Sequence, residues 1–343
     1  MPARLTAALL LAVGVAGHAA ELQLFASQEP LDVIIESRFN TLVRRAATRP
    51  EVPGVLRYTG AGGERVSVAM TMTTRGRSRL EMCRFPPLSL DFRESDAGDT
   101  LFAGQRKIKL VTHCGRGGRF MNYLHQEYGI YRAFNVLTGS SFRVRRLNVT
   151  YVDTEDKRRE EVRVAFMIES DREVVARLGM ERLDVEAIDP AKLDPAHENL
   201  FSVFQYLVAN TDWSNRKGPS GEGCCHNGKV IRTAGTEEGW IVLPYDFDQA
   251  GIINTHYALP DERLGIRSVR QRLFRGRCRN LDRMDETFAK FNDKRVELER
   301  ALLPDAVSDR ARRSTLGYID DFYTIINDPE ETRKRISEKC LGG

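Results

Sequence analysis

The alternation of apolar and polar residues in segment 54–79 constrains the fold most. The segment reads GVLRYTGAGGERVSVAMTMTTRGRSR, and a glycine-rich turn at residues 60–63 separates two runs of strand character. Successive side chains of a strand point to opposite faces of a sheet, so this pattern predicts a β-hairpin. Similar short runs predict further strands at residues 88–92, 106–114, 142–153 and 160–171.

The periodicity changes from strand to helix in the second half of the chain. Apolar residues at helical spacing predict a helix at residues 121–137, beside the strands, and a more apolar helix at residues 199–210. Short strands are predicted at residues 229–234 and 239–246, and helical patterns dominate after residue 280. We therefore predict an α+β protein with a β-rich N-terminal lobe at residues 21–170 and a mainly helical C-terminal lobe at residues 171–343.

Residues 1–20 have the layout of a secretory signal peptide. Arg4 precedes a short apolar run, and small residues precede Glu21. The apolar run is shorter than the ~20 residues that a membrane-spanning helix needs. We expect an exported protein, periplasmic or extracellular, with no transmembrane segment after cleavage. Cleavage removes one arginine, so the net charge falls from +4 to +3, a value that argues neither for nor against nucleic acid. No nucleic-acid partner is predicted.

The cysteine content favours disulfide bonds, because an even number in an exported chain is typical of them. Cys83 follows one early strand and Cys114 ends another, so we expect this pair to lie close together. One of the adjacent Cys224 and Cys225 is expected to pair with Cys278. The alternative is a zinc site that uses the adjacent cysteines and the next histidine. Adjacent cysteines lack the C-x-x-C spacing of such sites, so disulfides are favoured.

Two segments place carboxylates directly after apolar elements. NTDWSNRKG, residues 210–218, puts Asp212 after a helix, and WIVLPYDFDQAG, residues 240–251, puts Asp246 and Asp248 after a strand. Phosphoryl transfer from a nucleotide needs a lysine for the phosphates and a helix acid to position it. It also needs one aspartate for the attacking hydroxyl and another for Mg²⁺. Lys109 and Glu127 supply the first two. The competing interpretation is that these are ordinary turn aspartates and solvated charges.

These segments, in this order, resemble those of the CotH family of spore-coat and secreted proteins, which has a divergent protein-kinase-like fold. MTTRGRSRLEMCRFPPLSLDF resembles the early segment of that family, and YLHQEYGIYRAFNVLT resembles the helix that follows it. NTDWSN resembles its catalytic loop, and LPYDFDQAG its metal-binding segment. The resemblance spans most of residues 55–255. It implies a two-lobed protein-kinase-like fold that binds ATP with Mg²⁺ or Mn²⁺ and phosphorylates a protein substrate.

The resemblance also implies roles for individual residues. Asp212 becomes the catalytic aspartate, Asp246 the metal ligand with Asp248 beside it, and Glu127 the helix acid. The family strand that carries lysines has none here at residues 86–89. Lys109, on the next strand, is therefore the predicted phosphate ligand.

Four further positions complete the predicted site. Lys107 shares a strand face with the predicted phosphate lysine, and Glu169 lies at the predicted hinge between the lobes. The kinase-type asparagine that follows the catalytic aspartate is replaced by Lys217. Asn215 and Asn227 are the candidates for that metal ligand.

The leading prediction is an exported CotH-like atypical kinase that transfers phosphate from Mg-ATP to a protein hydroxyl. The runner-up is a non-catalytic envelope or surface protein that keeps the fold as a binding module, because the strand lysine is missing and the asparagine is displaced. A metal-dependent hydrolase is less favoured, because the six histidines show no H-x-H or H-E-x-x-H spacing.

Overall fold

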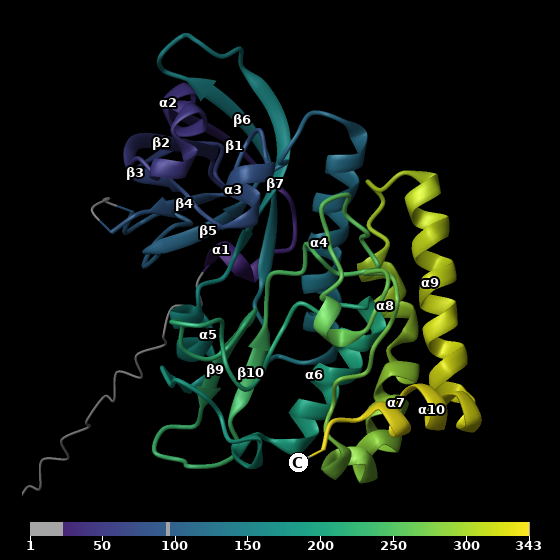
Figure 1. Ribbon diagram of the computed structural model, residues 1–343. Helices are drawn as coiled ribbons and strands as arrows, with labels where there is room; N and C mark the ends of the chain where they lie inside the picture. Colours follow the sequence, from purple (N-terminus) through teal and green to yellow (C-terminus); the bar gives the residue numbers. More distant parts are fainter. Residues whose placement is uncertain (1–22, 94–96, 343) are drawn as a thin grey trace, which may run out of the picture.

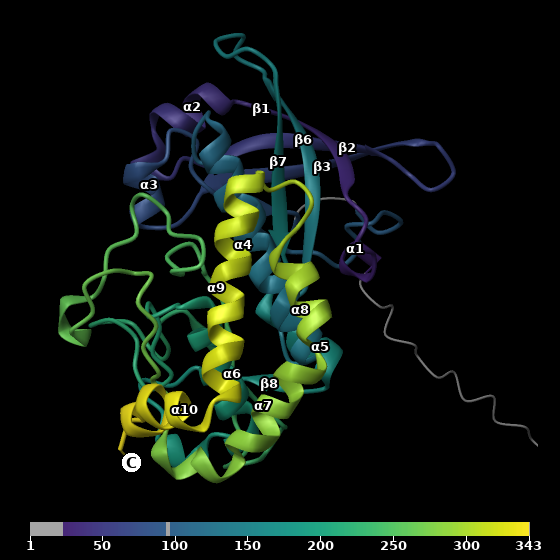
Figure 2. The same cartoon turned by 90° about the vertical axis from the view of Figure 1, so that its right-hand side faces the viewer.

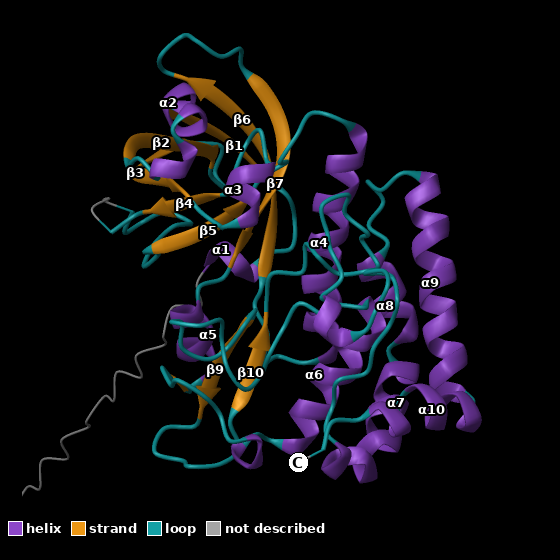
Figure 3. Cartoon of the chain, viewed as in Figure 1, coloured by secondary structure: helices purple, strands orange, loops and turns teal. Residues whose placement is uncertain are grey.

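The computed structural model describes residues 23–93 and 97–342. The predicted signal peptide lies outside these residues. The first part of the described chain forms a β-barrel, and the later part forms helices around a small sheet (Figure 1). Coloured by secondary structure, the strands of the barrel gather in one region and most of the helices in another (Figure 3).

Seven strands close into the barrel in the order β1, β2, β3, β4, β5, β7, β6. In chain order they are β1 (Leu31–Ser37), β2 (Val52–Thr59), β3 (Arg65–Thr74), β4 (Leu88–Asp91), β5 (Lys107–Val111), β6 (Val144–Asp153) and β7 (Glu161–Ile168). The predicted hairpin of segment 54–79 is confirmed as the antiparallel pair β2–β3. Apolar side chains fill the barrel, and Ile35, Leu56, Met72, Leu110 and Leu147 are completely buried there.

The closed barrel contradicts the predicted two-lobed protein-kinase-like fold. The strand LDVIIES, which became β1, was not assigned from periodicity. It pairs antiparallel with β2 and parallel with β6, where Leu31 lies opposite Leu147 and Ser37 opposite Asp153. A strand bonded along both sides leaves no free edge, so the sheet closes where a kinase-like lobe would keep a small open sheet.

Three short helices lie in the barrel part, namely α1 (Gln23–Ala26), α2 (Phe39–Arg44) and α3 (Ser78–Met82). The long helix α4 (Gly118–Leu137) follows β5 and packs on the outer face of the barrel, where its Tyr128 and Tyr131 contact Phe166 of β7 with ring centroids 5.8 Å and 5.9 Å apart. The prediction of a helix at residues 121–137 is confirmed. Through α4, the apolar core of the helical part extends onto the barrel wall.

The later helices are α5 (Asp171–Leu178), α6 (Pro195–Val208), α7 (Met284–Asp293), α8 (Arg295–Leu302), α9 (Asp309–Asn327) and α10 (Pro329–Arg335). Helix α6 begins where the Asp194 carboxylate accepts a hydrogen bond from the His197 N–H at 2.7 Å, with Pro195 in the first turn. Seen from the side, α9 and α8 stand beside α4 (Figure 2). None of the helices in the described residues is long and apolar enough to cross a membrane.

A three-stranded antiparallel sheet carries part of the candidate site. Its strands are β8 (Glu181–Arg182), β9 (Gly228–Arg232) and β10 (Ile241–Pro244), in the order β10–β9–β8. A small apolar core that includes Trp213 and Trp240 supports it. The strands predicted at residues 229–234 and 239–246 are therefore confirmed as β9 and β10.

All six cysteines form disulfides. The predicted proximity of Cys83 and Cys114 is confirmed, because the two are bonded. The predicted pairing of Cys278 with the adjacent cysteines is wrong. Cys278 pairs with Cys340, because the C-terminal segment returns to it and the Cys278 N–H donates to the Leu341 carbonyl at 3.0 Å. The adjacent cysteines pair with each other, so their sulfurs are not thiolate ligands for zinc.

Candidate functional site

The two predicted aspartate segments lie side by side. Helix α6 ends with Ala209 in a left-handed conformation, and the chain after β10 runs back along this end. The N–H groups of Gly251 and Ile252 donate to the carbonyls of Ala209 and Val208, each at 3.0 Å. A Cβ atom on Gly251 would lie only 2.0 Å from the Val269 carbonyl oxygen. Only glycine therefore allows the approach that brings the segments together.

Asp212 is held by donors from two later segments. Its carboxylate bonds to His226 Nε2 at 2.7 Å, and it accepts from Asn227 Nδ2 and Gln249 Nε2, each at 3.0 Å. The Asp212 hydrogen bond raises the pKa of His226. A carboxylate has about four lone pairs, so three donors leave about one for a further donor such as a hydroxyl.

Asp246 follows β10 directly and takes a left-handed conformation with a φ of 62°. Its N–H donates to the hydroxyl of Tyr131 on α4 at 2.8 Å, and this contact holds the turn. Burial and the nearby carboxylate of Asp248 raise the pKa of Asp246. Two carboxylates in one half-buried turn therefore repel each other and favour a proton or a cation between them.

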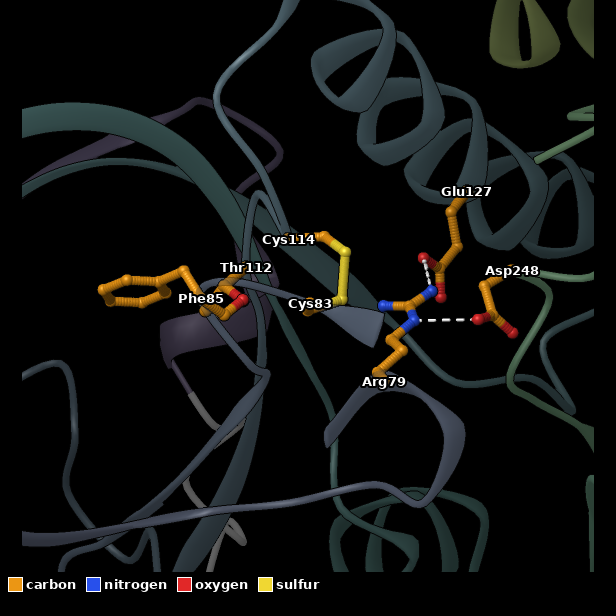
Figure 4. The surroundings of a disulfide bond; sticks show 7 residues. All are labelled: Arg79, Cys83, Phe85, Thr112, Cys114, Glu127 and Asp248. Atoms are coloured by element: carbon orange, nitrogen blue, oxygen red, sulfur yellow. Dashed lines mark hydrogen bonds and ion pairs between the residues drawn. A yellow bond between two sulfur atoms is a disulfide. The ribbon is translucent and has the colours of Figure 1, made fainter. Parts of the chain in front are cut away.

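A buried arginine joins the barrel part to this turn. Arg79 of α3 donates from Nη2 to Glu127 on α4 at 2.5 Å and from Nε to Asp248 at 2.8 Å (Figure 4). Burial raises the pKa of Glu127 in spite of the arginine, and Asp248 and Asp246 add to the rise. The predicted pairing of Glu127 with Lys109 is wrong, because Arg79 takes that place. One guanidinium serves two carboxylates, so negative charge remains in excess here.

Lys109 lies among other cations. Its Nζ is 4.4 Å from the centroid of the Tyr245 ring, and Lys229 Nζ approaches the same ring at 5.6 Å. Burial and the charges of Arg75 and Lys229 together lower the pKa of Lys109 to about 8, and the charges of Asp246 and Asp171 act against this shift. None of these three cations forms an ion pair with any residue that the structure describes. Three half-buried positive charges therefore converge without bonded acids.

Lys107 and Glu169 form no hydrogen bond or ion pair with Lys109 or with the aspartates of the two segments, and each has other polar partners. Lys107 is exposed, and its Nζ lies 3.7 Å from the carboxylate of Asp91 on the neighbouring strand. Glu169 is buried and accepts two bonds from Arg177, at 3.0 Å and 2.9 Å. It also accepts the N–H of Arg143 at 2.9 Å. These bonds use both oxygens of Glu169, so it fastens the end of β7 to α5.

The two predicted asparagine ligands already have other partners. Buried Asn215 donates to Glu198 at 3.1 Å, within the helical part. Asn227 donates its amide to the main-chain carbonyl and the carboxylate of Asp212, at 2.7 Å and 3.0 Å. Asn215 therefore does not join the aspartates, whereas Asn227 supports one of them.

The carboxylates of Asp246 and Asp248 can hold a metal ion only if a bound ligand supplies further oxygen atoms to that ion. Among the described residues, no three His, Cys, Asp or Glu side chains are placed to hold an ion together. Mg²⁺ at nucleotide sites takes one or two carboxylates and fills its other positions with phosphate and water. The carboxylates of Asp246 and Asp248 match this smaller requirement. Their mutual repulsion is the observation that favours a cation.

We use the name charged cluster for the groups that converge here, namely Arg75, Arg79, Lys109, Glu127, Asp212, His226, Lys229, Asp246 and Asp248. The sequence does not predict that four of them lie beside the aspartates, namely the basic residues Arg75, Arg79, His226 and Lys229. The two arginines lie within the segment RGRSR, and the sequence suggests for His226 only the less favoured zinc site. These residues are visible in the sequence, but their position beside the aspartates depends on contacts between distant segments of the chain. No protein-family model and no curated protein matches the chain.

Proposed function

We propose that the charged cluster binds the phosphate groups of ATP and that the protein transfers the terminal phosphoryl group to a protein hydroxyl. The observation that carries this proposal is the convergence of Arg75, Lys109 and Lys229, which form no ion pair with a described residue although Asp246 and Asp171 lie near Lys109. Like charges held together in a half-buried site repel one another until an anion binds. A polyphosphate such as that of ATP is such an anion, and its terminal phosphoryl group would lie beside the aspartates.

Asp212 is the proposed proton acceptor. The hydroxyl oxygen of the substrate forms a bond to the terminal phosphorus while the bond from that phosphorus to the bridging oxygen breaks. ADP leaves with the electron pair, and the hydroxyl proton passes to Asp212. His226 and Gln249 keep the carboxylate oriented through the bonds at 2.7 Å and 3.0 Å.

Asp246 and Asp248 would hold Mg²⁺ or Mn²⁺ together with the nucleotide. When bound, the ion neutralises charge on the phosphate oxygens. Arg79 fixes one oxygen of Asp248, and the side chain of Tyr257 also hydrogen-bonds to this carboxylate. The three disulfides and the absence of a membrane-spanning helix in the described residues agree with an exported protein, which we place in the periplasm or outside the cell.

Paired aspartate variants test the proposed transfer. We would co-express the protein with candidate envelope proteins and measure each partner by intact mass, and the wild type should add the mass of phosphate. Asp212→Asn should bind ATP yet transfer nothing, because the proton acceptor is lost and the metal ligands remain. Asp246→Asn should lose both ATP binding and transfer. Asparagine tolerates the left-handed backbone at this position, so the variant should keep the local structure.

The matched control is Asp305→Asn, whose side chain is fully exposed. It should transfer as the wild type does. A partner that gains phosphate equally with wild type and Asp212→Asn would contradict the proposed role of Asp212. If no partner gains phosphate with the wild type, the proposed transfer is overturned.

A non-catalytic binding protein is the second candidate. It is favoured by the bonds that already occupy the acids, since three donors hold Asp212 and an arginine holds Asp248. This candidate predicts that ATP binds and is recovered unchanged after long incubation. Formation of ADP by the wild type, but not by Asp212→Asn, would exclude it.

A further inference from the structure

A basic pocket of about 350 Å³ lies where segment 270–274 meets α9 and α10. Its volume falls in the range of small-molecule sites, roughly 300–1,000 Å³. Figure 2 shows α10 crossing the foot of α9 close to α6. Tyr206 of α6 and Tyr318 of α9 are among the lining residues, and none of the lining residues belongs to the charged cluster. The pocket is therefore a second site to be explained.

Positive charge exceeds negative charge in this pocket. Five of the lining side chains are cationic, and one, Asp321, is acidic. Three of the cations have acidic partners: Arg272 bonds to Asp321, Lys334 to Glu330 and Arg335 to Glu331. Five cations less three leaves Arg270 and Lys339, which have no acidic partner in the part of the chain that the structure describes. An excess of two charges matches a dianion.

The arginines are fixed in place before any ligand arrives. The Arg272 guanidinium lies 3.7 Å from the centroid of the Tyr318 ring, and its side chain is only 5% exposed. Arg270 stacks on the same ring at 4.7 Å, and the Tyr318 hydroxyl donates to the Arg270 carbonyl at 2.6 Å. The Arg272 guanidinium also bonds to the Asp321 carboxylate and the Tyr318 carbonyl, which holds it in place. Side chains that are already ordered lose little entropy when they bind an anion.

We propose that this pocket binds a phosphate monoester of a small molecule. At neutral pH a phosphate monoester carries close to two negative charges and three acceptor oxygens. A planar guanidinium group can donate to two such oxygens at once. The proposal does not depend on the function of the charged cluster.

The test uses phenyl phosphate as the probe, titrated into the full chain at low ionic strength and followed by calorimetry. The charged cluster also attracts phosphate, so every protein in the test carries Lys109→Gln. In this background the probe should bind. Adding Arg270→Gln and Lys339→Gln should weaken binding at least about tenfold, because charge-assisted hydrogen bonds are lost.

The matched control adds Arg65→Gln and Lys157→Gln, two exposed barrel residues, and removes the same charge elsewhere. It should bind within about twofold of the background, since distant exposed charges are screened. Arg270→Lys with Lys339→Arg should retain binding and show that the fold survives substitution there. Equal weakening by both double substitutions to glutamine, or no binding to the background protein, would overturn the site. If Lys109→Gln alone loses nucleotide binding, that result concerns the proposed function of the charged cluster and not the basic pocket.

Discussion

Lys109 lies beside the cations Arg75 and Lys229, and its charge is favoured by a cation–π contact with the Tyr245 ring and by the more distant Asp246 and Asp171. Burial and these two cations lower the pKa of Lys109 to about 8. The cost of holding this charge falls when an anion is bound, because the repulsion is then compensated. The protonation of one lysine therefore controls how well the cluster attracts phosphate.

We predict that ATP affinity falls as the pH rises from 7 to 9. Lys109 loses its proton as the pH passes about 8, and the neutral amine no longer attracts phosphate. The last ionisation of phosphate, with a pKa of ~6, is complete before this window, so the ligand charge stays constant. Calorimetric titrations at several pH values measure the effect. Lys109→Arg should bind with little dependence on pH in the same window. A wild-type affinity that stays constant to pH 9 would contradict this prediction.

At the scale of elements, the close packing of helix α4 against its neighbours determines the position of the site residues that it carries. Helix α4 carries Glu127 and Tyr131, and it packs against α8 at Gly129. A Cβ atom on Gly129 would lie 2.6 Å from the Ala301 carbonyl oxygen. The main chains of the two helices approach closely at this point, and any larger residue forces them apart.

We predict that Gly129→Ala destabilises the protein by about 1–3 kcal/mol, the usual cost of overpacking. The control is Gly317→Ala in α9, where a Cβ atom meets nothing within 4 Å. That change should stabilise the protein by about 0.5–1 kcal/mol, because alanine favours a helix over glycine. Denaturant unfolding of both variants measures the difference. Equal stability changes in the two variants would show that α4 and α8 are not tightly packed at this glycine.

Local periodicity predicted the hairpin β2–β3 and the helices α4 and α6, because each is formed by contacts between near neighbours. It did not predict the barrel, because closure depends on Leu31 pairing with Leu147, far along the chain. The same reason applies to the site. Asp212 and Asp246 follow apolar elements and were recognisable, whereas the partner of Glu127 is Arg79, 48 residues away.

For the whole molecule, Arg79 connects the barrel part to the helical part. It extends from α3, beside the Cys83–Cys114 disulfide, to acids on α4 and after β10 (Figure 4). The apolar core of the helical part already reaches the barrel wall through α4, and this polar contact adds a second link between the two parts. Removing the arginine would leave two buried carboxylates without their cation.

We predict that Arg79→Met lowers the free energy of unfolding by about 3–5 kcal/mol, as expected when one partner of a buried ion pair is lost. Adding Glu127→Gln should recover part of this loss, because one uncompensated charge is then removed. The control is Arg77→Met, whose ion pair with Glu222 is exposed and contributes at most about 1 kcal/mol. Urea unfolding of the three proteins gives the comparison. Similar losses for Arg79→Met and Arg77→Met would contradict the assigned role of Arg79.

The most direct test of the central proposal is a calorimetric titration of Mg-ATP into the wild type, Lys109→Gln and Lys107→Gln at pH 7. The two lysines lie two residues apart on β5, but only Lys109 belongs to the charged cluster, since Lys107 is exposed beside Asp91. The wild type and Lys107→Gln should bind ATP equally, and Lys109→Gln should lose at least about tenfold in affinity with the charge-assisted contact. No binding by the wild type, or equal binding by all three proteins, would contradict the proposal.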